Sequence, residues 1–368
     1  MQKQLLNNFK EDELIFLQNL LNTSSPSGNE YELVREVSLF LNGVCNLQTD
    51  SIGNLYIRSL NHTTSQIMIT AHGDEVGFQI TQIDTKGFCY MRRLGGLDKQ
   101  TIPGTVLCVS GKDRSLIGVM GKTPPHIQNS NDKEHTLDLN SLWVDFGFSD
   151  KEEAESHIEI GDYLTAYPNY YWSNNGTNII SKGLDNKISV FILAVSMKRL
   201  AISNQLPTNI VGVVTTQEEI GCRGSIIATQ NIKPKIAICL DVGITTDIPN
   251  GGAYKELSLF NIGKGFGLCI TPDNNPKLTK LLKTVCIEKN IPFQISTALR
   301  PAGGTETARI QLENGGIPVC HISIPNRYMH SCVEMCNIND AYSTVNLLEN
   351  ALSMLSEADI DDFNLFTI

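Results

Sequence analysis

Histidine and carboxylate side chains stand at five places where an apolar run ends or where a turn follows it. These places are His72 with Asp74, Asp185, Glu218 with Glu219, Asp241, and His330. In an open α/β sheet, binding sites form at the ends of the strands. Imidazole and carboxylate groups suit divalent metal ions, and one carboxylate can bridge two ions about 3.5–4 Å apart. Together, the five places predict a site for two metal ions.

The adjacent pair Glu218 and Glu219 is the most informative of these places. Neighbouring side chains in a strand point to opposite faces, but at a junction of strand and turn both can reach one cavity. One glutamate could then be a metal ligand and the other a free base. The alternative is a solvated acidic turn, because acids are seldom buried. The apolar run at 210–215 favours the first interpretation, because it predicts a buried strand just before the pair.

Each of the other four places also has an ordinary structural explanation. His72 and Asp74 fit a polar turn, and Asp185 fits the N-cap of a helix. Asp241 fits a turn acid, and His330 fits a hydrogen-bonded loop histidine. The metal-site hypothesis therefore depends on the occurrence of all five places in one chain.

Two further residues are weaker candidates. His321 lies within a predicted strand and fits a core or edge histidine better than a metal ligand. Arg300 could select the charge of a substrate, although a surface arginine is the simpler interpretation.

Helices and strands that could position these residues alternate at both ends of the chain. Periodicity and cap residues predict helices over 11–22 and about 30–41. Apolar runs predict strands at 55–57, 67–70, 210–215 and 236–240. Between about 77 and 166, short alternating runs separated by turn residues predict a small β-barrel or sandwich. The expected fold is α/β, with a mostly parallel sheet flanked by helices and a small inserted β domain.

The composition narrows the function and the location. The 368 residues include 29 Lys and Arg against 39 Asp and Glu, and the net charge of −10 disfavours nucleic acid and anionic lipid as partners. The ten cysteines include no CxxC pair and are scattered, most of them in apolar surroundings, which is more typical of a reducing compartment than of a disulfide framework. The N-terminal stretch is amphipathic and acidic, unlike a signal peptide, and no apolar run reaches the roughly 18 residues of a membrane span. We therefore expect a cytoplasmic protein.

Several motifs, in their order and spacing, resemble the metal-dependent aminopeptidases that include bacterial glutamyl aminopeptidase and the tetrahedral TET aminopeptidases. The resemblance covers nearly the whole chain and rests on SSPSGNEYELVREV, TAHGDEVGF, LGGLDKQTIPGTVL, KGLDNK, TTQEEIGCRGS, LDVG, GGTET and IPNRYMHSCVE. It implies a zinc-exopeptidase-like catalytic domain over residues 1–75 and 169–368, with a β-barrel domain inserted at 76–168. It also implies that the barrel serves oligomerisation, through dimers that build into twelve-subunit shells.

The same resemblance implies a set of metal ligands. His72 and Asp241 would bind one divalent ion, and Glu219 and His330 would bind the other. Asp185 would bridge the two ions. Zinc, cobalt and manganese all suit histidine and carboxylate ligands.

The remaining two residues would have catalytic roles. Glu218 would be the general base that takes a proton from the attacking water. Asp74 would orient the ring of His72 without binding a metal ion itself. The implied reaction is the release of N-terminal amino acids from peptides.

Three other functions are compatible with parts of this pattern. A related two-metal amidohydrolase, such as a deacylase or a dipeptidase, would use the same ligands and differ only in its substrate pocket. A glycosidase, the activity behind the endoglucanase label of some relatives, would need two carboxylates about 5–9.5 Å apart and usually no metal. A non-catalytic scaffold would keep the fold, but the intact ligand set argues against it.

Three residues depart from the usual pattern of the family. Lys187 stands where arginine is usual, Glu306 where aspartate is usual, and Cys332 where proline is usual. Lysine keeps the positive charge but lacks the bidentate fork of arginine. None of the three replaces a metal ligand, so an active enzyme is expected, with its substrate preference open.

Overall fold

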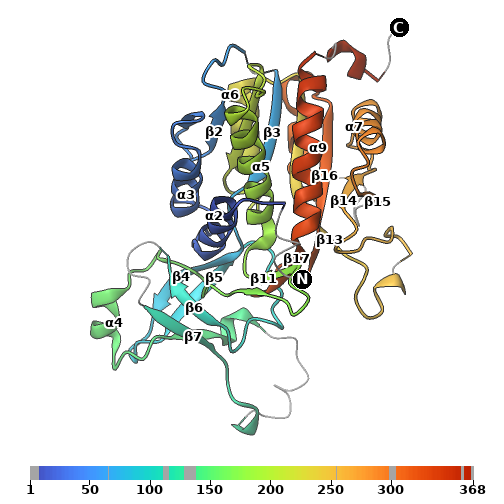
Figure 1. Ribbon diagram of the computed structural model, residues 1–368. Coiled ribbons are helices and arrows are strands. Elements are labelled where there is room, and N and C mark those ends of the chain that lie inside the picture. Colours follow the sequence, from blue (N-terminus) through green and yellow to red (C-terminus); the bar gives the residue numbers. More distant parts are fainter. Residues whose placement is uncertain are drawn as a thin grey trace.

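The computed structural model describes residues 8–64, 66–110, 116–127, 138–253, 255–297, 304–357 and 360–365. Within these ranges, a large mixed sheet with helices on both faces adjoins a closed β-barrel (Figure 1). The predicted α/β class with an added small barrel is confirmed. Among the described helices, none combines the length and apolar character that a bilayer span requires.

The large sheet is parallel at its centre and antiparallel at its flanks. Its strands are β1 (Asn46–Thr49), β2 (Leu55–Arg58), β3 (Ile67–His72), β10 (Tyr170–Trp172), β11 (Asn178–Ser181), β12 (Ile210–Thr215), β13 (Ile236–Ile244), β14 (Phe266–Cys269), β15 (Phe293–Ser296), β16 (Val319–Arg327) and β17 (Glu334–Asn337). The order is β1-β2-β12-β3-β13-β16-β17-β11-β10, and β14 pairs with β16 and β15. Strands β12, β3, β13 and β16 run parallel to one another, so their carboxyl ends meet at one edge.

Helices cover both faces of this sheet, which explains the apolar runs of its central strands. The helices are α2 (Glu11–Asn22), α3 (Tyr31–Leu41), α5 (Leu184–Ile202), α6 (Arg223–Ile232), α7 (Pro276–Glu288), α8 (Thr307–Ile310) and α9 (Ile338–Glu357), with short 3-10 turns η4 (Gly251–Ala253), η5 (Glu313–Gly315) and η6 (Ile360–Phe363). In β13, Ile236, Ile238 and Leu240 pack in the larger core with α2, α3, α5, α7 and α9. Ala237 and Cys239 point to the other face and pack with α6 and α8.

The barrel follows β3 in the chain and has a core of its own. Its elements are β4 (Gly77–Ile83), β5 (Cys89–Leu94), β6 (Val106–Val109), β7 (Ile117–Gly121), η1 (Pro125–Ile127), η3 (Leu139–Ser141), β8 (Trp143–Asp145), α4 (Lys151–His157) and β9 (Tyr163–Ala166). The strands close in the order β4-β5-β8-β7-β6-β9. Phe78, Leu107, Val144 and Leu164 are among the side chains that fill the interior. Closure pairs the strand edges, so the barrel needs no partner from the large sheet.

Candidate metal centre

Neighbouring strand ends and adjacent loops bring the predicted ligands together. His72 ends β3, and Asp241 lies in the neighbouring parallel strand β13. Glu219 follows β12, Asp185 begins α5, and His330 lies between β16 and β17. The five side chains come from parts of the chain far apart in sequence, and they lie close together at the carboxyl edge of the sheet.

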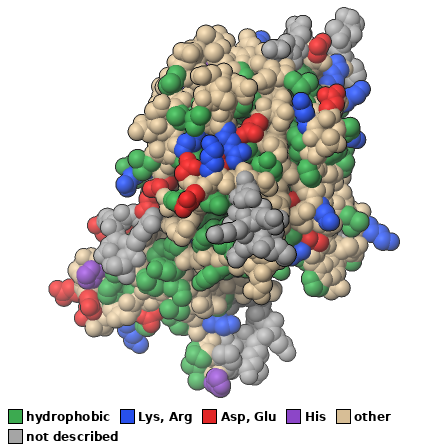
Figure 2. All heavy atoms as spheres, in the orientation of Figure 1, with side chains coloured by type: hydrophobic (Ala, Val, Ile, Leu, Met, Phe, Trp, Pro, Cys, Tyr) green, Lys and Arg blue, Asp and Glu red, His purple; other side chains and the backbone are tan. Residues whose placement is uncertain are grey.

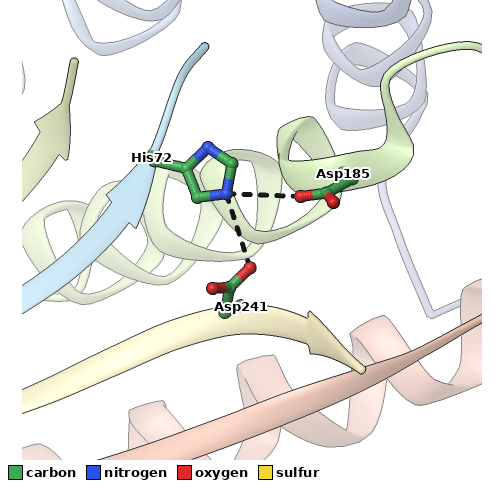
Figure 3. Close-up of side chains that lie close together, drawn as sticks. All are labelled: His72, Asp185 and Asp241. Atoms are coloured by element: carbon green, nitrogen blue, oxygen red, sulfur yellow. Dashed lines mark ion pairs between the residues drawn. The ribbon is translucent and has the colours of Figure 1, made fainter. Parts of the chain in front are cut away.

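These residues form two groups, each with a histidine and two carboxylates. In the first group, His72 Nε2 lies 3.2 Å from Asp185 Oδ1 and 3.5 Å from Asp241 Oδ1 (Figure 3). In the second group, His330 Nε2 lies 3.3 Å from Asp185 Oδ2 and 3.4 Å from Glu219 Oε1. The ligand atoms of each group lie within 4.8 Å of one another. Asp185 therefore faces both groups, with a different oxygen toward each.

The chemistry of these groups fits divalent cations. Glu219 Oε1 is buried and makes no hydrogen bond with any described residue; its 3.4 Å ion-pair contact with His330 Nε2 gives only part of the compensation that a buried polar atom requires. Asp185, Glu218, Glu219 and Asp241 also line a single cavity, where their negative charges repel one another. A cation within each group would satisfy the unpartnered oxygen and balance these charges.

The pKa values show the same need for positive charge. Burial raises the pKa of Glu218 well above its usual range, and Asp241 adds to the shift while His72 opposes it. Burial lowers the pKa of His330, but Asp185 and Glu219 outweigh burial and raise that pKa to about 11. A divalent cation within each group would supply positive charge beside these buried carboxylates.

In both histidines, Nδ1 is hydrogen-bonded to the backbone and Nε2 faces the two carboxylates of its group. His72 Nδ1 donates to the backbone oxygen of Asp74 at 3.1 Å, and His330 Nδ1 donates to the backbone oxygen of Gly96 at 3.1 Å. A hydrogen bond of this kind sets the tautomer and orients the ring of a metal-binding histidine.

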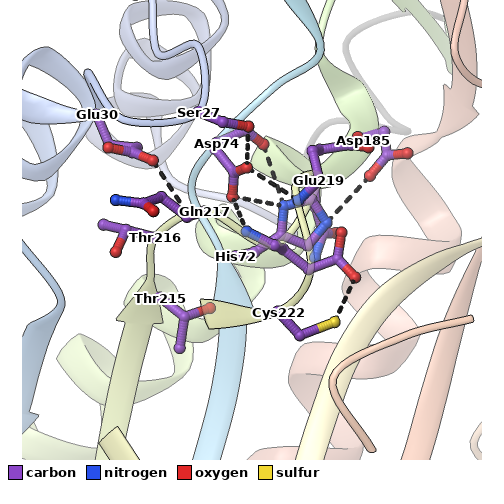
Figure 4. A network of polar contacts seen from close by, with 12 residues as sticks. Ser27, Glu30, His72, Asp74, Asp185, Thr215, Thr216, Gln217, Glu219 and Cys222 are labelled. Carbon is purple, nitrogen blue, oxygen red and sulfur yellow. Dashed lines mark hydrogen bonds and ion pairs between the residues drawn. The ribbon is translucent and has the colours of Figure 1, made fainter. Parts of the chain in front are cut away.

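The predicted residue Asp74 connects three parts of the site (Figure 4). Its carboxylate lies 3.4 Å from His72 Nδ1. It accepts hydrogen bonds from the backbone nitrogens of Glu218 and Glu219 at 2.9 and 3.1 Å, and from Ser27 Oγ at 2.6 Å. Asp74 therefore fixes the turn that carries the glutamate pair as well as one histidine.

The structure shows two features that support the site and were not predicted from the sequence. The buried carboxylate of Glu334 accepts hydrogen bonds from the backbone nitrogens of Asp185 at 2.7 Å and His330 at 3.1 Å. Gly95 and Gly96, just after β5, press against the second group: a Cβ at Gly95 would lie 3.1 Å from Glu219 Oε2, and one at Gly96 would lie 2.9 Å from His330 Nδ1. Glu334 and the two glycines all lie within the quoted motifs, but only the fold shows that they contact the candidate ligand residues.

Glu218 points into the same cavity but belongs to neither metal-binding group. Cys222 Sγ donates to Glu218 Oε1 at 3.2 Å. Burial raises the pKa of the Cys222 thiol far above its usual range, so it stays a protonated donor. Sequence reasoning missed this contact, because a single cysteine in a turn gives no sign of its partner.

The three departures from the family pattern lie away from the ligand atoms. Lys187 is fully buried and donates to Glu75 Oε1 at 2.7 Å. Glu306 is buried and accepts a hydrogen bond from Thr215 Oγ1 at 2.6 Å. Cys332 accepts from Thr105 Oγ1 at 3.4 Å. Arg300, the candidate for charge selection, lies outside the described residues.

The two groups that could hold metal ions lie at one end of a cavity of about 750 Å³. The other end is lined by residues of β13 to β16 and by the segment at α8. A cavity of this size, with ligands at one end and a pocket beyond them, can hold a small molecule or the end of a chain.

Solved structures with this fold include several aminopeptidases. The TET aminopeptidase from the archaeon Thaumarchaeota archaeon SCGC AB-539-E09 is similar with a TM-score of 0.90 and 25% identity, covering 96% of this chain and 100% of that one. The TET1 peptidase of Pyrococcus horikoshii, which can assemble into a tetrahedron or a large octahedral shell, is similar with a TM-score of 0.81 and 25% identity, covering 92% and 99%.

Sequence comparison agrees with the likeness of the structures. The lysyl aminopeptidase of Pyrococcus furiosus is 28% identical over 347 residues, which is 93% of this chain and 97% of that protein. The model of the M42 glutamyl aminopeptidase family matches residues 53–347, most of the chain. The predicted resemblance is confirmed, and the chain belongs to the M42 glutamyl aminopeptidase family of peptidases.

Proposed function

We propose that this chain is a two-metal aminopeptidase that releases the first residue of peptides. The observation that carries the proposal is the position of Asp185, whose two carboxylate oxygens face two separate groups of ligands. A bridging carboxylate between two such groups is the arrangement that a pair of metal ions needs.

The five converging side chains would hold the ions. His72 and Asp241 would bind the first, Glu219 and His330 the second, and Asp185 both. The ions, when bound, would polarise the scissile carbonyl group and lower the pKa of water toward about 7.

Glu218 is the proposed general base. Its Oε1 is occupied by the thiol of Cys222, which leaves Oε2 for the proton of the attacking water. The water oxygen adds to the carbonyl carbon, the C–N bond breaks, and Glu218 delivers the same proton to the leaving amine. Asp74 holds Glu218 in place because its carboxylate accepts a hydrogen bond from the backbone nitrogen of Glu218.

A metal-dependent activity screen tests this function. We expect purified protein to release free amino acids from peptides with a free N-terminus, and to lose this activity on chelation. Zinc, cobalt and manganese are each added back, and bound metal is measured by elemental analysis, with two ions per chain expected. Metal binding to the native state is also expected to raise the melting temperature above that of the chelated protein.

Two control substrates separate the alternatives in the same assay. Cleavage of N-acyl amino acids in place of peptides would support the amidohydrolase. Chelator-resistant hydrolysis of cello-oligosaccharides would support the glycosidase and contradict the metal mechanism.

We also propose that residues 1–75 and 169–368 form the catalytic domain and that the inserted domain, residues 76–168, serves oligomerisation. Apolar side chains gather on the barrel surface (Figure 2), where Val106, Ile117 and Val119 are more than two-fifths exposed. Apolar patches on a protein surface mark interaction sites. Assembly of the Pyrococcus horikoshii relative into a shell supports a homo-oligomer of dimers, with a dodecamer as the expected form.

Light scattering tests the assembly. We expect a mass that is a multiple of the 40.6 kDa chain, and the mass of a single chain would contradict the proposal. Val119→Lys places a charge on the barrel surface and is expected to reduce the mass while the melting temperature is kept. Ile287→Lys, which changes an exposed residue of α7, is the matched control and should leave the mass unchanged.

We propose peptides as substrates and the cytoplasm as the location. All ten cysteines are free, although most are buried, which fits a reducing compartment. The net charge of −10 gives no support to nucleic acid or membrane as a partner.

A further inference from the structure

The cavity extends beyond the metal-binding groups to a second end with a different character. Cys269 of β14, Ser296 of β15, and His321 and Ser323 of β16 line this end. All four are at most 6% exposed, so the end is a closed floor and not part of the outer surface. Their side chains offer hydrogen-bonding groups in a place where water is largely excluded.

His321 stands out on this floor because one nitrogen of its imidazole, Nε2, has no hydrogen-bond partner among the described residues. Its backbone nitrogen donates to Asn274, but Nε2 is buried and has no hydrogen-bond partner among the described residues. Buried polar atoms of native proteins nearly always have a partner, and an exception calls for an explanation. A ligand that enters the cavity would supply the missing hydrogen bond.

The floor carries no negative charge of its own. Among the described lining residues, the only carboxylates are Glu218 and those of the two metal-binding groups. Burial lowers the pKa of His321, although Asp241 and Asp273 oppose this, so the ring is neutral. Burial raises the pKa of Cys269 to about 12, so its thiol is neutral too. Arg309 lines the cavity as well, but it is exposed.

We propose that this floor binds the side chain of the substrate's first residue, and that His321 selects a neutral carboxamide, as in glutamine or asparagine. The inference rests on the proposed aminopeptidase function and adds a substrate class to it. A carboxamide both donates and accepts, so it can pair with either tautomer of His321 and with the neighbouring hydroxyl groups.

Other side chains fit this floor less well. The four described residues of the floor include no counter-ion for an ammonium or carboxylate group, and burying such a group unpaired is costly. An alkyl chain would leave His321 unpartnered, and sites built to hydrogen-bond a substrate discriminate strongly against analogues that lack the group.

A series of aminoacyl p-nitroanilides tests the preference, because the leaving group is constant. We expect the kcat/KM of the metal-loaded protein for the glutamine substrate to exceed those for norleucine, glutamate and lysine by at least about tenfold, the contribution of one neutral hydrogen bond. His321→Leu should lower kcat/KM for glutamine about tenfold and leave norleucine unchanged or improved. His321→Gln, which keeps a hydrogen-bonding group, should retain the preference. His157→Gln, in the barrel helix α4, is the control and should change neither value.

Binding of the product gives a readout that does not depend on turnover. Free glutamine should raise the melting temperature of the wild type more than free norleucine does, and His321→Leu should remove the difference. A wild-type preference for glutamate or lysine would overturn the inference, as would an equal loss on all substrates in His321→Leu. Failure of the proposed function looks different, because then no aminoacyl substrate is cleaved with any added metal. If His321→Leu does not fold, the wild-type ranking and His321→Gln still decide the outcome.

Discussion

Replacing Glu218 with glutamine is expected to lower kcat for peptide hydrolysis by about two to four orders of magnitude, the usual contribution of a general base. The amide has nearly the same shape as the carboxylate but cannot take the proton from water. Because Glu218 belongs to neither metal-binding group, the variant should bind as much metal as the wild type. Activity would thus be lost from an otherwise intact centre.

Three measurements on the Glu218→Gln variant separate a lost base from a damaged site. Single-substrate kinetics give kcat, elemental analysis gives the bound metal, and thermal unfolding gives the melting temperature. Glu155→Gln, at a half-exposed position of α4, is the matched control and should behave as the wild type. Equal peptidase activity in the wild type and Glu218→Gln would show that another group is the base.

Replacing Glu75 with glutamine is expected to destabilise the fold by about 3 kcal/mol, because it removes the anion of a buried ion cluster. Lys182 Nζ donates to both carboxylate oxygens of Glu75, at 2.7 and 2.8 Å, and Lys187 Nζ donates to Oε1 at 2.7 Å. Burial raises the pKa of Glu75, but the two lysines outweigh it and lower that pKa to about 2, so the carboxylate is charged at neutral pH. Without it, two buried lysines face each other.

The expected loss lies at the low end for a broken buried pair because one lysine can release its proton. Burial and Lys182 lower the pKa of Lys187 to about 7, although Glu75 opposes them. The free energy of unfolding is measured by urea denaturation. Asp12→Asn breaks the exposed pair with Lys198, 3.2 Å away, and should cost at most about 1 kcal/mol. A cost in Glu75→Gln no larger than this control would contradict the prediction.

This cluster also connects stability to the metal centre. A Cβ at Gly183 would lie 2.6 Å from Glu75 Oε2, so the backbone that leads into Asp185 passes directly over the cluster. Lys187, two residues after Asp185, is buried and donates a hydrogen bond to the same glutamate, Glu75. We infer that Lys187 supports the start of α5 and does not contact the substrate.

Much of the site could be predicted from the sequence because its ligands follow apolar runs. His72, Glu219 and Asp241 each lie at or near the end of a buried parallel strand, and parallel strands bring their carboxyl ends to one edge. The barrel was predictable for a similar reason: its short strands alternate with turn residues. Helices α2 and α3 lie close to their predicted positions because one face of each is apolar.

Other features depend on contacts between residues far apart in the chain. Spacing alone could not show that Glu334 holds the backbone of both Asp185 and His330, or that Gly96 fixes the ring of His330. Such bonds link loops whose approach depends on the packing of the sheet and the barrel. Likewise, only the fold shows that Lys187 is paired with the buried carboxylate of Glu75.

The α/β class and the barrel were predictable from the residues alone, and so was the set of candidate ligands, because periodicity and strand ends are local properties. Which oxygen of Asp185 faces which histidine, and the contact of Glu218 with Cys222, depend on long-range packing and are visible only in the fold. The fold also places His321, predicted as a core or edge histidine, on the floor of the cavity, where its Nε2 has no hydrogen-bond partner among the described residues. Burial and pairing are properties of the packed chain, so only the fold could show which buried polar groups lack a partner.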